Sequence, residues 1–223
     1  MSGETSAEGD PDAMYAYDPV LMTAEGAILL RPGKEGRQGE PDAFAPDLES
    51  AGVRIAGRLE APATAEGGDM FFLGRRTLAV GRGYRTNDEG IAQLRRMLRH
   101  FEIFAFDLPH QNGPSECLHL MSLISPLGAD LAVGYAPLIP VRLMEQLQSR
   151  GIAFVDVPEE EFPTMGANVL SLGPGKALAL DGNPETKRRL EAAGVEVHTY
   201  RGKEISRNGD GGPTCLTLPL DRG

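Results

Sequence analysis

The chain has 223 residues, 41% of them hydrophobic and 24% charged, which suits one large globular domain with a sizeable core. The formal net charge of −10 argues against nucleic acid as a partner, because an acidic surface repels phosphate backbones. Two cysteines, Cys117 and Cys215, are too few for a disulfide framework and predict a cytoplasmic protein. No apolar run approaches the roughly 18 residues of a membrane span, so no membrane association is expected.

The chain is predicted to consist of a disordered acidic tail over residues 1–10 and one domain over residues 11–223. Within that domain a weak pattern recurs four times: two short apolar strands, an amphipathic helix and a third strand. The predicted strands cover residues 20–22, 27–30, 53–55, 70–73, 77–80, 103–106, 118–125, 129–133, 152–155, 168–172, 176–180 and 195–198, and the predicted helices cover residues 42–51, 89–100, 140–150 and 184–193. Each unit is too small to bury its own apolar face, so the repeat predicts units stacked around a common axis.

Polar side chains occur where predicted strands begin or end, and the loops of successive units would converge on the axis. An acidic Glu-Gly-Gly-Asp segment, residues 66–69, precedes one strand, and His119 lies in the predicted strand 118–125. Cys215 follows a Gly-rich loop over residues 208–213. A thiolate at neutral pH needs a nearby base or cation, and histidine titrates near neutrality. His119 is therefore the natural partner of Cys215.

Each of these residues also has a purely structural interpretation. Cys215 could be a small buried hydrophobe and His119 a core histidine on an apolar strand. Glu66 and Asp69 could cap their own turn instead of binding a cation or orienting His119. Arg85 could be solvated instead of clamping a carboxylate. Taken together, however, carboxylates, a histidine, an arginine and a thiol suit a guanidinium group carried by an amino acid.

The order of these motifs resembles the pentein superfamily of guanidino-group-modifying enzymes, and within it the dimethylargininase family, over residues 11–220. That resemblance implies an α+β pentein fold, an α/β propeller of ββαβ modules around a pseudo-fivefold axis. About four modules are visible, so the family's first module is expected to be absent. The segment after Cys215 is expected to be a strand, left unpaired or paired with another chain. Deiminases and amidinotransferases of the superfamily carry an aspartate where this chain has Met121, which favours a dimethylargininase.

The resemblance also implies a role for each motif residue. Catalysis is assigned to Cys215 as the nucleophile and to His119, oriented by Glu66. The substrate-binding residues are Asp12 and Asp18 at the guanidinium, Arg37 and Arg85 at the carboxylate, Asp210 at the amine, and Asp69 in the acidic segment. The implied reaction is hydrolysis of N-methylated arginine to citrulline and a methylamine through a covalent thiouronium intermediate, with no metal or organic cofactor.

Three other functions stay open at this point. The first is arginine deimination or amidino transfer, within the same superfamily. The second is a truncated, non-catalytic pentein that binds a guanidino ligand or a partner chain, and the third is a structural protein without a site. If the protein is an enzyme, its expected binding partner is a small cationic amino-acid substrate. We also expect the chain to form a homo-oligomer.

Overall fold

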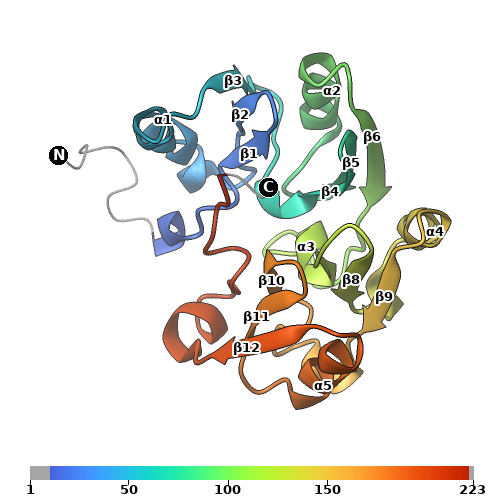
Figure 1. Cartoon of the computed structure of the whole chain (residues 1–223). Helices are drawn as coiled ribbons and strands as arrows, with labels where there is room; N and C mark the ends of the chain where they lie inside the picture. Colours follow the sequence, from blue (N-terminus) through green and yellow to red (C-terminus); the bar gives the residue numbers. More distant parts are fainter. Residues whose placement is uncertain (1–10, 221–223) are drawn as a thin grey trace.

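Four three-stranded sheets are arranged around a common axis, with the four longer helices toward the outside, in the computed structural model, which describes residues 11–220 (Figure 1). The first module contains β1 (Val20–Thr23), β2 (Gly26–Leu29), α1 (Glu40–Ser50) and β3 (Ile55–Arg58), and the second contains β4 (Met70–Gly74), β5 (Thr77–Arg82), α2 (Asp88–Met97) and β6 (Glu102–Asp107). The third contains α3 (Leu120–Leu123), β7 (Ile124–Pro126), β8 (Leu131–Gly134), α4 (Val141–Ser149) and β9 (Ala153–Asp156), and the fourth contains β10 (Val169–Gly173), β11 (Lys176–Leu180), α5 (Pro184–Ala192) and β12 (Glu196–Tyr200). The tail predicted for residues 1–10 lies outside the described residues.

All four modules have the same topology. The first two strands pair antiparallel, and the third strand returns, after the helix, to pair parallel with the second. The prediction of four ββαβ units is therefore confirmed. The boundaries of several elements differ from the predicted ones; for example, α2 ends at Met97, before the predicted end at His100.

The second module shows how the local sequence forms such a unit. Asn87 caps α2, because its side-chain oxygen accepts a hydrogen bond from the Gly90 N–H at 2.8 Å. Ile91 and Leu94 then fall on one face of the helix at helical spacing and are buried. That face packs on the sheet, where Leu78 of β5 is also fully buried.

Neighbouring modules share their hydrophobic cores. One cluster joins Leu30, next to β2, to Leu78 and Leu94 of the second module. A second joins β4 to α3 and α4, and a third joins β8 to β10 and α5. Each module therefore buries part of its apolar surface against a neighbouring module, as expected for a stack.

The predicted strand over residues 118–125 is wrong in its first half. Residues Leu120–Leu123 form one helical turn, α3, and only Ile124–Pro126 form strand β7. The turn is stabilised at its start, because the Leu120 N–H donates to Asp69 Oδ1 at 3.0 Å and the His119 N–H donates to the Ser122 hydroxyl at 3.1 Å. His119 accordingly lies at the start of a helix and not within a strand.

The strand predicted after Cys215 is also wrong over the residues that the structure describes. Residues 215–220 contain turns and irregular backbone, and Leu218 packs against the core of the first module. After β12 the chain crosses from the fourth module back to the first, as the red segment of Figure 1 shows. Within residues 11–220, none of the helices combines the length and apolarity needed to cross a bilayer.

Candidate active site

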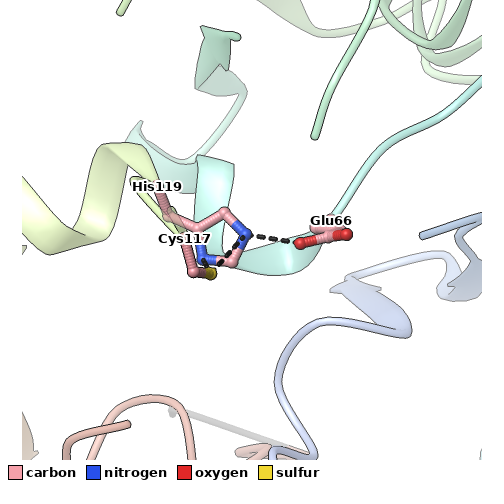
Figure 2. A group of neighbouring side chains, drawn as sticks. All are labelled: Glu66, Cys117 and His119. Carbon is pink, nitrogen blue, oxygen red and sulfur yellow. Dashed lines mark hydrogen bonds and ion pairs between the residues drawn. The ribbon is translucent and has the colours of Figure 1, made fainter. Parts of the chain in front are cut away.

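The centre of the site is a buried pair formed by Glu66 and His119 (Figure 2). Glu66 directly precedes a short helical turn, Gly67–Asp69, and His119 directly precedes α3. Glu66 Oε2 and His119 Nε2 lie 2.6 Å apart, and Glu66 Oε1 accepts a hydrogen bond from the Gly33 N–H at 2.9 Å. Gly68 permits this approach, because a Cβ at that position would overlap the imidazole ring. Both side chains are thus held in one orientation.

Each member of this pair stabilises the charge of the other. Burial raises the pKa of Glu66, but the hydrogen bond and charge of His119 outweigh it and lower that pKa to about 2. Burial lowers the pKa of His119, yet the charges of Cys117 and Asp18 and the hydrogen bonds to Cys117 and Glu66 raise it well above its ordinary value. These interactions favour the protonated form of His119, whose Nε2 faces Glu66 and whose Nδ1 faces away from it.

Asp18 lies on the Nδ1 side of His119. Its Oδ1 is 3.9 Å from Nδ1 and accepts a hydrogen bond from the Gly68 N–H at 2.9 Å. Its Oδ2 accepts a hydrogen bond from Arg37 Nη1 at 2.7 Å. Asp18 is buried, so bulk water screens the attraction between its carboxylate and a nearby cation only weakly.

Arg37 has partners other than the substrate carboxylate that we predicted for it. Its guanidinium bonds Asp18 and, through Nε at 2.7 Å, Glu40, and it also donates to the Tyr15 carbonyl. Burial lowers the pKa of Arg37, but the bonds to Glu40 and Asp18 raise it above its ordinary value. In this structure Arg37 therefore positions Asp18, and binding a substrate carboxylate would require these bonds to break.

Asp69 is held by partners within the protein. Its two oxygens accept hydrogen bonds from the Thr86 hydroxyl at 2.7 Å and from the Leu120 N–H at 3.0 Å, and the residue is fully buried. Burial raises the pKa of Asp69 to about 6. Asp69 thus joins the segment after β5 to the start of α3, next to His119.

The other predicted substrate-binding residues are less confined. Arg85 Nη1 lies 3.7 Å from Glu66 Oε1, and among the described residues the buried Arg85 Nε has no hydrogen-bond partner. Asp12 forms an ion pair with Lys34. Asp210 is exposed on the loop before Cys215 and has a positive φ of 56°. Arg85 therefore borders the Glu66–His119 pair, and Asp210 lies at the solvent edge.

Cys215 is positioned by a side chain that we did not predict, Asn168. The Asn168 amide donates to Sγ at 3.5 Å, and its oxygen accepts from both the N–H and the hydroxyl of Thr214, at 3.1 and 2.9 Å. Gly212 permits this packing, because a Cβ there would overlap Asn168. A buried asparagine at the start of a strand has no local sequence signature, so only the fold reveals this contact.

The pKa of the Cys215 thiol depends on burial and on nearby charged and polar groups. Burial and the charge of Asp18 raise its pKa, whereas the charge of His119 and the hydrogen bond from Asn168 lower it, and the net shift is upward. Cys215, from the end of the chain, lies next to the segment that carries Asp18, because its carbonyl accepts a hydrogen bond from the Tyr17 N–H at 3.2 Å. Cys117, which we did not assign to the site, lies beside His119, with Sγ 3.6 Å from Nδ1.

These features define a pentein of the guanidino-group-modifying class: ββαβ modules around an axis, with a cysteine, a histidine and carboxylates where their loops meet. Comparison with known proteins agrees. A model of the arginine deiminase family matches residues 43–139 and 129–222. The chain belongs to this family, and it is therefore a carbon–nitrogen hydrolase of the class that acts on amidines.

Individual relatives support the same assignment. A curated N(G),N(G)-dimethylarginine dimethylaminohydrolase from Streptomyces coelicolor is 31% identical, over 96% of this chain and 76% of the relative. A mutant of the Pseudomonas aeruginosa dimethylarginine dimethylaminohydrolase, solved with citrulline, has a TM-score of 0.76 at 26% identity, over 92% of this chain and 75% of that chain. The N-terminal domain of ArgZ, a cyanobacterial arginine dihydrolase, shares the fold, with a TM-score of 0.83 at 24% identity over 96% of this chain and 77% of that domain.

Proposed function

We propose that this protein hydrolyses N-methylated arginine to citrulline and a methylamine, with Cys215 as the nucleophile. The observation that carries the proposal is the buried Glu66–His119 pair, with Oε2 and Nε2 2.6 Å apart and Nδ1 3.9 Å from the buried Asp18 carboxylate. The related dimethylarginine dimethylaminohydrolases support the choice of substrate. Two free cysteines support the cytoplasmic location predicted from the sequence.

The first step is attack of the Cys215 thiolate on the guanidinium carbon. The raised pKa of Cys215 keeps the thiol protonated at rest. A bound guanidinium lowers that pKa by its charge, and it also neutralises Asp18, which otherwise opposes the thiolate. The substrate thus generates its own nucleophile, which protects the thiol from other reactions.

The second step is loss of the methylated amine. The bond between the carbon and that nitrogen breaks, and the proton on His119 Nδ1 passes to the leaving amine, giving a covalent thiouronium. Neutral His119 then takes one proton from water, which attacks the carbon. The carbon–sulfur bond breaks, the second proton of the water passes to sulfur, and citrulline and the Cys215 thiol are released. Glu66 contacts His119 at Nε2 and leaves Nδ1 available for proton transfer. Glu66 can therefore stabilise the imidazolium both before the amine leaves and after water has attacked. Asp12, Arg85 and Asp210 are proposed to contact the rest of the substrate.

The proposal is tested by citrulline release from asymmetric dimethylarginine and from arginine, supplied separately to the purified chain. We expect citrulline from the methylated substrate and none from the Cys215→Ala variant. Turnover by a folded Cys215→Ala variant would overturn the covalent mechanism.

Arginine hydrolysis is the second candidate, favoured by the arginine deiminase model that matches most of the chain. The same assay distinguishes it, because citrulline from arginine would reassign the protein as a deiminase. Dependence of turnover on an added amine acceptor would indicate an amidinotransferase. A folded protein that binds a guanidino ligand but releases no product would be the non-catalytic pentein.

A further inference from the structure

A cavity of about 1320 Å³ lies between the modules, apart from the candidate active site. All four modules contribute to its lining: strands β1 and β4, the β7–β8 and β10–β11 turns, and the last described residues, 218–220. Within residues 11–220, the lining leaves out Cys215, His119 and Glu66. Protein interiors contain few voids, and pockets for small molecules have volumes of about 300–1,000 Å³. A hollow of this size is therefore a candidate ligand site.

Large apolar side chains of the lining are exposed to solvent. Phe72, Leu172 and Leu220 are 36%, 51% and 45% exposed, and all three line the cavity. They come from the second module, the fourth module and the last described residues, so apolar surface extends from the cavity to the outside. Exposed apolar side chains that gather at one place mark a surface that binds another molecule.

A second copy of the chain and the segments 1–10 and 221–223 match this cavity poorly. Residues 1–10 carry three acidic side chains, and residues 221–223 are Asp-Arg-Gly, so neither segment has the apolar side chains that the lining requires. Two copies related by a twofold axis place the same patch opposite itself, so that hollow would meet hollow. A separate, flexible apolar molecule fits better.

The charged groups of the lining favour an anionic head group on that molecule. Among the described residues they are Arg75, Lys176 and Asp130, so cations outnumber anions in the lining of a chain whose net charge is −10. Lys176 forms an ion pair with Glu196 at 3.4 Å, whereas the Arg75 side chain has no hydrogen bond or ion pair within residues 11–220. A guanidinium can bind a carboxylate through two parallel hydrogen bonds.

We propose that this cavity binds an anionic amphiphile of the fatty-acid type, with its alkyl chain between the modules and its carboxylate at Arg75. Arg75 directly follows β4 and lies three residues after the exposed Phe72, so the cation and the apolar surface belong to the same edge of the cavity. Burial of methylene groups supplies most of the affinity, and Arg75 sets the orientation. Binding is non-covalent and does not depend on the proposed hydrolysis.

The first test is titration calorimetry of the full chain with octanoate, decanoate and dodecanoate below their micelle concentrations. We expect one bound molecule per chain and an affinity that rises about fourfold with each added methylene group. Dodecylammonium, which has the same alkyl chain and a positive head group, should bind at least about tenfold more weakly than dodecanoate. Affinity that does not depend on chain length, or equal binding of dodecylammonium, would overturn the proposal.

The second test locates the bound dodecanoate with two pairs of surface variants. Arg75→Ala should bind at least about tenfold more weakly, and Arg76→Ala, at the next residue of the same turn but outside the lining, should bind normally. Leu172→Glu places a negative charge beside the cavity and should also weaken binding. Its control is Val141→Glu, at a side chain that is 74% exposed and outside the lining. Circular dichroism checks that all four are folded, and equal affinities within both pairs would overturn the site.

Other occupants give different results in the same experiments. Self-association that Leu172→Glu abolishes, without dodecanoate binding, would show that this face joins two copies. Sedimentation of the chain with phosphatidylglycerol vesicles, again without binding of free dodecanoate, would show that the face docks on a membrane. Either result would overturn the proposal. Each readout is binding and not turnover, so a chain that releases no citrulline fails the proposed function and leaves this test unaffected.

Discussion

At the scale of single residues, the site depends on a few polar contacts made in a dry environment. Glu66 is fully buried, and its two oxygens are taken by His119 and by the backbone of Gly33. A buried charge without such partners would be costly, so each partner is needed for the other to remain ionised.

Glu66→Gln should lower kcat by about 100-fold, because the amide cannot stabilise the imidazolium that donates the proton. It should also change the dependence of stability on pH. The pKa of Glu66 is lowered from 4.5 to about 2, so its contribution to the free energy of unfolding is complete above pH 4.5 and is lost as the pH falls toward 2. Urea denaturation at several pH values should show that the free energy of unfolding falls less steeply for the variant between pH 4.5 and about 2. An equal dependence on pH in the two proteins would contradict the charged pair.

Asn168→Ala should lower kcat by about 100-fold, because the thiol is no longer held at its attacking position. It should also destabilise the fold by about 2 kcal/mol, since the buried Thr214 N–H loses its acceptor. The control is Asn168→Asp, which keeps the acceptor but places a negative charge near Cys215. Its pH–rate profile should move to higher pH, and an unchanged profile would argue against contact with the thiol.

At the scale of elements, the histidine is oriented by a helical turn and not by a strand. Asp69 holds the start of α3 through Leu120 and, through Thr86, the segment after β5. The start of α3, in the third module, is thereby fixed to two segments of the second module.

Asp69→Ala should destabilise the protein by about 3 kcal/mol, because it leaves the Leu120 N–H and the Thr86 hydroxyl buried without an acceptor. Asp69→Asn retains an acceptor for Leu120 and should cost clearly less. Urea denaturation measures both variants. A loss below about 1 kcal/mol in Asp69→Ala would show that water replaces the carboxylate.

At the scale of the whole molecule, the proposed nucleophile, Cys215, is brought to the first module because the end of the chain returns there. The Tyr15 hydroxyl bonds the carbonyls of Ile205 and Gly209, the Tyr17 N–H bonds the Cys215 carbonyl at 3.2 Å, and Leu218 packs on the first core. The first and fourth modules are thus joined by the segment that carries Cys215.

Tyr15→Phe should lower kcat while changing stability by only about 1 kcal/mol, because one hydroxyl anchors the loop before Cys215 to the first module. Tyr135→Phe, at a ring stacked on Phe162, is the matched control and should behave like the unmodified chain. Steady-state kinetics and thermal melting separate the two effects. Equal kcat in Tyr15→Phe would show that the loop needs no such anchor.

The sequence by itself determined the repeating ββαβ unit, because alternating and helical apolar spacing acts locally. The pairing of His119 with Glu66 was implied by the family resemblance, and the structure places their Nε2 and Oε2 atoms 2.6 Å apart. Only the tertiary structure decided the helical turn at α3, the irregular end of the chain and the contacts of Arg37, Asp69, Asn168 and Cys117. These depend on partners distant in the sequence, whose buried charges and donors are satisfied only once the modules have packed together.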